Sequence, residues 1–163
     1  YDQLANVIHL LKNDPTSRRI IINLWHAPDL DKVALPACLY CYQFYVDDGM
    51  LSCKVTQRSS DISLAGGWNI ASGSLLTYML AHVCGLKPKE LIWSVGDTHI
   101  YLNQLSSTGI CPIQAQLDRV PRKFPTLHIK TSPQDNDFTK FEFNHFVLGD
   151  YKPYPAIKFE MNA

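Results

Sequence analysis

The sequence predicts an α+β fold in which a mixed β-sheet packs against one central helix that is buried on most sides. Residues 33–46 and 50–57 flank Asp47-Asp48-Gly49, a turn that is typical of a hairpin between paired strands. Residues 69–84 are apolar on nearly every side over the length of a helix. Residues 90–100 predict a further strand after this helix, so strands and helices are interspersed along the chain.

The other elements follow from the turn signals along the chain. Asp2 to Leu11 repeats apolar residues at helical spacing, and the turn residues 13–16 end this helix. The β-branched run 20–25 predicts a buried strand, residues 63–67 a flexible loop, and Gly85 a C-cap for the central helix. Later we expect a partly helical stretch, two strands and an alternating tail, at residues 100–117, 126–130, 141–148 and 157–161.

Composition predicts one soluble globular domain, residues 1–163, that lacks its N-terminal portion, because Tyr1 already lies within a helical pattern. No run of eighteen apolar residues could span a bilayer. Fifteen basic and fifteen acidic residues give a net charge of zero, which argues against a nucleic-acid polymer or a membrane surface as partner. Five cysteines without regular spacing predict a reducing compartment, the cytoplasm or the nucleus.

Cys38 and Arg58 are the first candidates for chemistry. A cysteine is a nucleophile only as its thiolate, which a guanidinium stabilises, and the same guanidinium can bind a phosphate. The alternative for Cys38 is the small buried hydrophobe that a free cysteine usually is. Cys38 and Cys41 form a C-x-x-C, but residues three apart on a strand face opposite sides, so we expect no metal and no redox dithiol. The pair predicts covalent chemistry on a phosphorylated substrate.

Several short motifs resemble thymidylate synthase, with the order and spacing of that family from Cys38 to Tyr101. They are Leu35-Pro36-Ala37-Cys38, Gln43-Phe44-Tyr45-Val46, Leu51-Ser52-Cys53, Gln57-Arg58-Ser59-Ser60-Asp61, Asn69-Ile70-Ala71-Ser72 and Gly96-Asp97-Thr98-His99-Ile100-Tyr101. The resemblance extends over nearly the whole chain. It implies the family's fold, with the sheet at a homodimer interface.

The resemblance implies reductive methylation of dUMP to dTMP, with 5,10-methylenetetrahydrofolate as co-substrate. Cys38 would add to C6 of the uracil ring, which makes C5 able to attack the methylene carbon of the folate. Arg58 would bind the phosphate beside Cys38. Asn69 would donate to uracil O4 and accept from the N3 proton, a pattern that cytosine cannot match. From the residues alone, Asn69 could equally be the N-cap of the following helix.

The resemblance also implies binding roles for residues outside this catalytic group. Arg18 and Arg19 would reach the phosphate in the partner subunit of the homodimer, although exposed basic residues are usually solvated charges. Asp61 would meet both the pyrimidine and the folate, or would be a turn aspartate. The other implied nucleotide contacts are Gln57, Ser59, His99 and Tyr101, and the other folate contacts are Leu64, Ala65, Trp68 and Met161. Trp25, Trp68 and Trp93 are otherwise most simply core or cleft aromatics.

Departures from the family pattern keep two alternatives open. Leu39 stands where histidine is usual, residues 65–68 replace the usual Gly-x-Pro-Phe beside the folate, and Gly73 replaces a tyrosine. A glycine inside an exposed helix costs about 1 kcal/mol relative to alanine. The missing N-terminal portion carries a phosphate-binding arginine, a folate-stacking tryptophan and a proton-transferring glutamate in the family. The alternatives are a dUMP hydroxymethylase and a non-catalytic remnant that binds nucleotide or dimerises.

Overall fold

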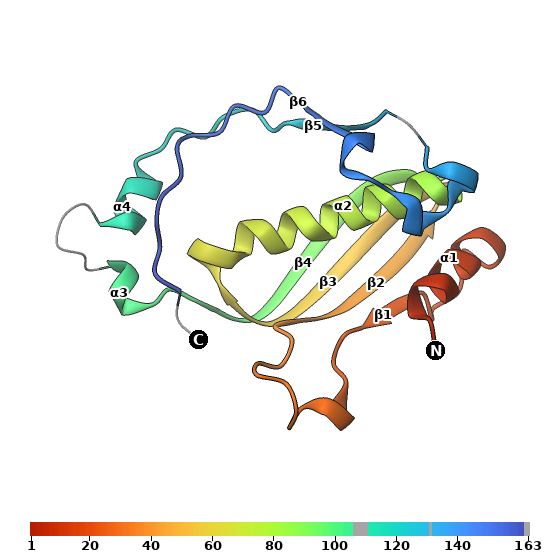
Figure 1. Cartoon of the computed structure of the whole chain (residues 1–163), viewed down its shortest axis with the longest axis horizontal. Coiled ribbons are helices and arrows are strands. Elements are labelled where there is room, and N and C mark those ends of the chain that lie inside the picture. The colour runs from red at the N-terminus through yellow and green to blue at the C-terminus, as the bar shows by residue number, and fades with distance from the viewer. Residues whose placement is uncertain (106–110, 131, 162–163) are drawn as a thin grey trace. The chain divides into compact units, whose positions relative to one another are not determined.

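The computed structural model describes residues 1–105, 111–130 and 132–161 (Figure 1). The chain divides into two compact units, Tyr1–His99 and Ile100–Ala163. Gly109, where the sequence predicts a break in the partly helical stretch, lies outside the described residues.

The N-terminal unit is built on a four-stranded sheet in the order β1-β2-β3-β4. Strands β1 (Ile21–Asn23), β2 (Leu39–Asp47) and β3 (Met50–Asp61) are antiparallel neighbours, whereas β4 (Lys87–His99) runs parallel to β3. Helix α2 crosses one face of this sheet (Figure 1). The mixed sheet confirms the predicted α+β class.

The hairpin between β2 and β3 forms at the predicted turn. Asp48 and Gly49 both have positive φ angles, 48° and 70°, as the primed turns of two-residue hairpins require. Strand β2 begins at Leu39, later than the expected residue 33, because residues 24–38 form an exposed loop that contains two prolines. The hairpin therefore places the start of β2 beside the end of β3.

Helix α1 (Gln3–Asn13) confirms the first predicted helix. The carboxylate of Asp2 caps it by accepting from the amide of Ala5 at 2.9 Å, and Val7 and Leu11 are buried. Strand β1 is shorter than the predicted run 20–25, because its pairing with β2 ends at Asn23 and the side chains beyond it are exposed.

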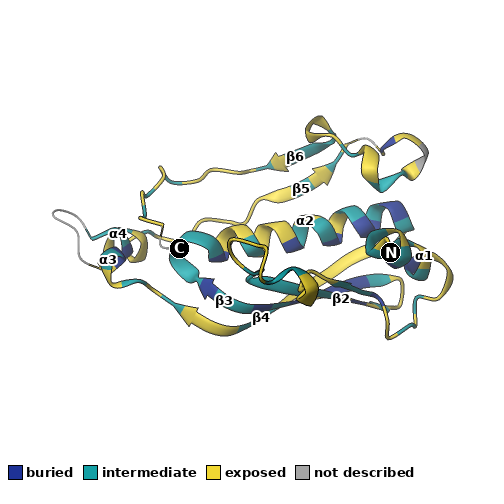
Figure 2. Cartoon of the chain, turned by 60° about the horizontal axis from the view of Figure 1, so that its bottom comes forward, coloured by how far each residue is buried: buried dark blue, intermediate teal, exposed yellow. Residues whose placement is uncertain are grey.

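Helix α2 (Gly67–Cys84) ends at Gly85, whose φ of 69° confirms the predicted C-cap. Within this chain the helix is buried along one face only, and Figure 2 shows buried and exposed positions alternating along it. Its buried residues are Gly73, Thr77, Leu80, Ala81 and Val83, whereas Trp68, Ile70, Leu75 and Tyr78 are exposed. An all-round apolar pattern carries no helical period, so the sequence could not indicate which face the sheet covers.

Two further segments of the N-terminal unit differ from expectation. The predicted loop 63–67 is the single π-helical turn η2 (Ile62–Gly66), and Asp61 caps it. Strand β4 starts at Lys87, earlier than the expected residue 90, and continues to His99, because it stays paired with β3 from the Met50–Lys87 pair to the Asp61–His99 pair. Strands β3 and β4 therefore terminate at the same end of the sheet.

The C-terminal unit contains helices α3 (Leu102–Leu105) and α4 (Pro112–Leu117) and an antiparallel pair, β5 (Thr126–Ile129) and β6 (Phe146–Gly149). Strand β5 confirms the prediction. The predicted strand 141–148 is partly replaced by the 3₁₀ turn Phe143–His145, in which the Phe143 side chain is 96% exposed. The alternating tail 157–161 forms no regular secondary structure. Within the described residues, no helix has the length and apolar character needed to cross a membrane.

Candidate active site

The side chains of Cys38 and Arg58 meet at the open end of the β2–β3 hairpin. The Arg58 Nη2 atom lies 3.6 Å from the Cys38 sulfur. The same guanidinium donates to two backbone carbonyls, from Nη2 to Pro36 at 2.8 Å and from Nε to Ala37 at 3.1 Å. Both side chains are half-buried. This arrangement places a fixed positive charge against a thiol that a ligand can reach, as a cysteine nucleophile requires.

A β-bulge sets this contact. Near the turn, paired residues of β2 and β3 follow the register Asp47↔Met50 to Cys41↔Thr56, and the register then shifts so that Leu39 faces Gln57. The shift brings the Arg58 amide to the Cys38 carbonyl at 2.7 Å. Bulges of this kind redirect side chains and are common beside active sites. The sequence gives the turn, but no residue pattern in it indicates the bulge.

The other cysteines of this unit have environments unlike that of Cys38. Burial raises the pKa of Cys53 to about 11, and it also raises the pKa of Cys41 and of Cys84. All five cysteines of the chain are free thiols. Desolvation therefore holds these three sulfurs in the unreactive thiol form, whereas Cys38 faces a cation.

The residues on either side of Arg58 belong to the last part of strand β3. Gln57 is only 1% exposed, its Nε2 donates to the Ser59 carbonyl, and its Oε1 accepts from the Trp93 indole, both at 2.9 Å. Asp61 accepts from the amides of Ser63 and Leu64 at 3.2 and 3.1 Å. The aspartate thus fixes the turn that follows the strand, as its alternative interpretation predicted.

Asn69 and the implied folate contacts follow Asp61 directly. Helix α2 begins at Gly67, so Asn69 lies in its first turn and is not the N-cap that local sequence suggested. Its side-chain amide makes no hydrogen bond within the described part of the chain. Leu64 and Ala65 lie half-buried in η2, and Trp68 is 76% exposed at the start of α2. The first turn of α2 therefore carries an amide side chain, Asn69, and an exposed indole, Trp68, that a ligand could contact.

Arg18 and Arg19 lie in the exposed turn between α1 and β1. Neither makes an ion pair within the described part of the chain. His99 ends β4, with its Nδ1 3.3 Å from Asp97 Oδ1. Tyr101 and Met161 belong to the C-terminal unit, and Met161 is 80% exposed. The structure thus brings the side chains of Cys38 and Arg58 together and places Gln57 and Ser59 beside Arg58 along β3. The placement of Tyr101 and Met161 at this site stays a prediction.

Sequence reasoning missed three groups that hold the site. The carbonyls of Pro36 and Ala37 fix the Arg58 guanidinium, and backbone acceptors leave no signal in a sequence. Trp93, expected only as a core or cleft aromatic, donates to Gln57. The signal available was the alternation along the strand, which places Trp93 on the same face as Leu91 and Val95.

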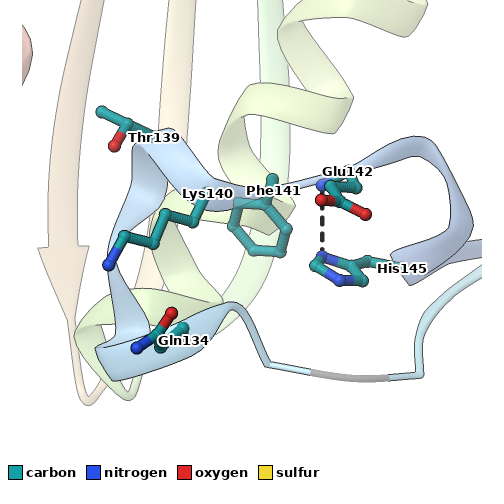
Figure 3. A pocket seen from close by; sticks show the side chains of 6 residues that line it. All are labelled: Gln134, Thr139, Lys140, Phe141, Glu142 and His145. Carbon is teal, nitrogen blue, oxygen red and sulfur yellow. Dashed lines mark hydrogen bonds between the residues drawn. The ribbon is translucent and has the colours of Figure 1, made fainter.

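Described residues of the C-terminal unit line two cavities, and none of the implied site residues is among them. One, of about 350 Å³, is lined by Gln134, Thr139, Lys140, Phe141, Glu142 and His145 (Figure 3). There the Glu142 amide donates to His145 Nδ1 at 3.2 Å. None of the implied site residues lines it. We found no group of three His, Cys, Asp or Glu residues placed to hold a metal ion anywhere in the described ranges.

The second cavity, of about 300 Å³, lies where the C-terminal tail meets the end of α4. Arg119 donates to the Pro155 carbonyl at 2.7 Å, and Arg122 donates to the carbonyls of Lys152 and Pro153. Both guanidinium groups lie over the Tyr154 ring, 5.2 and 3.8 Å from its centroid. These contacts tie the tail to the unit at residues 152–155.

Comparison with known proteins gives one consistent result. The family model described as thymidylate synthase matches residues 1–163. The thymidylate synthase of human herpesvirus 8 type P (isolate GK18) is 49% identical over 99% of this chain and 46% of its own length. That of Coxiella burnetii (strain Dugway 5J108-111) is 46% identical over 96% of this chain and 57% of its own. The bifunctional dihydrofolate reductase-thymidylate synthase of Plasmodium chabaudi is 45% identical over 99% and 27%. The chain spans about half the length, or less, of these relatives.

Proposed function

The chain belongs to the thymidylate synthase family, and we propose that it carries the nucleophile and the nucleotide-binding strand of an enzyme that methylates dUMP to dTMP. Both units would form part of one such domain, since the family model spans both. The observation that carries the proposal is the 3.6 Å contact between Arg58 Nη2 and the Cys38 sulfur. This contact supports a covalent mechanism because it favours the thiolate that must add to the pyrimidine.

The nucleotide would be bound by groups at the ends of β3 and β4. Arg58 keeps the N–H donors of Nη1 beyond those that it gives to the two carbonyls and to the Cys38 sulfur, and these can reach a phosphate. Ser59 as a further phosphate contact is implied by the family alone. Asn69, whose side-chain amide makes no hydrogen bond to a described residue, can donate to O4 and accept from N3–H of uracil. A cytosine would leave that amide mismatched at two atoms, so we infer that dUMP is preferred over dCMP.

The folate side is supported by the chemistry of the first turn of α2. Trp68 presents an exposed indole there, and Leu64 and Ala65 offer apolar surface in η2, which suits a planar heteroaromatic ring such as a pterin. When bound, 5,10-methylenetetrahydrofolate would supply the one-carbon unit and the hydride. Asp61 would act by holding η2 in place, and Met161 and the nucleotide contacts His99 and Tyr101 remain implied by the family alone.

A homodimer is supported by the face of the sheet that α2 does not cover. Tyr45 and Ile92 point to that face and are 64% and 47% exposed, although both lie within long strands. Exposed apolar side chains on an uncovered sheet face favour burial against a second copy. Arg18 and Arg19, whose side chains make no ion pair with a described residue, could then reach the phosphate of the partner subunit. The five free thiols support a reducing compartment, cytosolic or nuclear.

The test is the covalent adduct itself. We expect the protein that carries this chain, incubated with 5-fluoro-dUMP and 5,10-methylenetetrahydrofolate, to gain the mass of both ligands at Cys38, and a Cys38→Ala variant to gain neither. A matched control is Cys41→Ala, which removes the other thiol of the C-x-x-C and should leave the adduct intact. Catalysis would be refuted if a preparation that binds dUMP forms no adduct. With dUMP itself, mass spectrometry separates dTMP from the hydroxymethyl product.

A further inference from the structure

Trp93 lies between the two segments that the proposed site requires. Its indole N–H donates to Gln57 Oε1 at 2.9 Å, next to Arg58 on β3. The far edge of the same ring, at Cη2, lies 3.5 Å from the position that a Cβ atom on Gly66 would take. Gly66 is the last residue of η2, which carries the implied folate contacts. One rigid aromatic plane therefore contacts both the strand of the nucleotide and the turn of the folate.

The Gln57 amide has no solvent to replace a lost partner. Gln57 is 1% exposed, and its side chain is held at both atoms, by Trp93 at Oε1 and by the Ser59 carbonyl at Nε2. A buried amide oxygen without a donor is strongly disfavoured, so without the indole N–H this side chain must turn or its strand must shift. The Trp93 hydrogen bond thus fixes the conformation of β3 at Gln57.

The position of Gln57 determines where Arg58 points. Adjacent residues of a strand face opposite sides of the sheet, and Gln57 is held on the side that α2 covers, with Val55. Arg58 is therefore turned to the other side, where its guanidinium meets the carbonyls of residues 36 and 37 and the Cys38 sulfur. A rotation of the strand at Gln57 would move that guanidinium away from the thiol.

The contact with Gly66 is set by the absence of a side chain there. A Cβ on Gly66 would lie 2.8 Å from Ile62 Cδ1, the end of a side chain that would have to turn away, and 3.5 Å from Trp93 Cη2, which is ordinary van der Waals contact. Leu64 and Ala65 precede it in the same turn, which Asp61 caps. The Trp93 ring contacts the turn from the side of the sheet, and the Asp61 carboxylate holds its start at the end of β3.

We propose that Trp93 is a positioning residue that aligns the nucleotide-binding strand with the folate-side turn through these two contacts. The proposal rests on the proposed function for the identity of the ligands. The two contacts involve different parts of the ring, so they can be separated. Trp93→Phe removes the N–H donor together with the outer part of the ring that faces Gly66, whereas Gly66→Ala displaces the Ile62 side chain in the turn and leaves the hydrogen bond intact.

Steady-state kinetics on the protein that carries this chain separate the two contacts. We expect Trp93→Phe and Trp93→Leu to raise KM for dUMP at least about fivefold and to raise KM for the folate as well, since a small displacement of a binding group is costly. Gly66→Ala, which keeps the indole N–H, should raise KM for the folate with a smaller change in KM for dUMP. The matched control is Thr77→Val, which removes another buried hydrogen bond, to the Gly73 carbonyl at 2.8 Å, away from the site. It should lower Tm without changing either KM.

A second measurement needs no substrate. Alkylation of Cys38 by iodoacetamide reports the Arg58–Cys38 contact, and Trp93→Phe should slow it at least about threefold while Thr77→Val leaves it unchanged. Suppose that Trp93→Phe slows alkylation and Thr77→Val does not, but the wild-type protein neither binds dUMP nor turns over. The positioning role then stands and the proposed function fails. If the wild type turns over, and Trp93→Phe lowers Tm as Thr77→Val does without altering KM or alkylation, Trp93 is a core residue and the positioning role is refuted.

Discussion

Replacing Arg58 by glutamine tests the central contact of the site. The guanidinium lies 3.6 Å from the Cys38 sulfur. Coulomb's law at that separation gives about 1.2 kcal/mol in a dielectric of about 80 and about 5 kcal/mol at about 20. Both side chains are half-buried, and solvent screening favours the lower value. We therefore expect Arg58→Gln to slow the labelling of Cys38 by iodoacetamide near neutral pH by up to about sevenfold, since about 1.4 kcal/mol corresponds to tenfold.

The assay is the rate of iodoacetamide labelling at Cys38 as a function of pH, with peptide mapping to separate the cysteines. Cys41 in the same molecule is an internal reference, because burial raises its pKa. Arg19→Gln is the matched control, since it removes an exposed arginine that does not contact the thiol. The electrostatic argument is wrong if Arg58→Gln keeps its Tm and labels Cys38 at the wild-type rate. Arg58→Lys, which keeps the charge but not the paired carbonyl contacts, should fall between.

Three further outcomes follow from packing and burial. In Gly73→Ala the new methyl group would lie 3.0 Å from Val55 Cγ2. The cost of overpacking, about 2 kcal/mol, should exceed the gain in helix propensity, about 1 kcal/mol, so we expect Tm to fall. A rise in Tm would contradict this. The raised pKa of Cys53, about 11, implies stability that is complete below the unfolded thiol's pKa and is lost as pH rises towards 11. Urea unfolding at pH 8 and 10.5 should show this loss, and Cys53→Ala should show less of it. Arg122→Ala, which loses the contact with Tyr154, should speed hydrogen exchange in residues 150–161 without lowering Tm of the N-terminal unit.

The hairpin shows how far local sequence determines the site. The Asp47-Asp48-Gly49 turn fixes a register that places Cys38 opposite residue 59, so sequence alone predicts that the cysteine lies near the Gln57 to Asp61 motif. The bulge beyond Cys41 shifts this pairing by one residue and brings Arg58 to the thiol. A bulge depends on tertiary packing and leaves no residue signature here, so the exact partner could not be predicted.

Long-range contacts explain the other differences. The apolar pattern of residues 69–84 predicts helix α2 and its glycine cap, but it could not indicate that one face stays uncovered within this chain. The turn η2 was expected to be a flexible loop because its glycines favour irregular backbone, whereas the Asp61 cap and the Trp93 ring order it. The family resemblance implies which polar residues bind ligands, whereas only the fold shows that Gln57 is buried and held by hydrogen bonds.

The two carbonyl contacts of Arg58 have a consequence for the protein without ligand. Because the guanidinium is already anchored by residues 36 and 37, its entropy is lost on folding, and a nucleotide does not have to order it. The cation is thus preorganised beside the sulfur before any ligand arrives. A half-exposed cysteine beside a cation is a kind of site that peroxide oxidises readily, so a ligand that covers Cys38 would also shield it from oxidation.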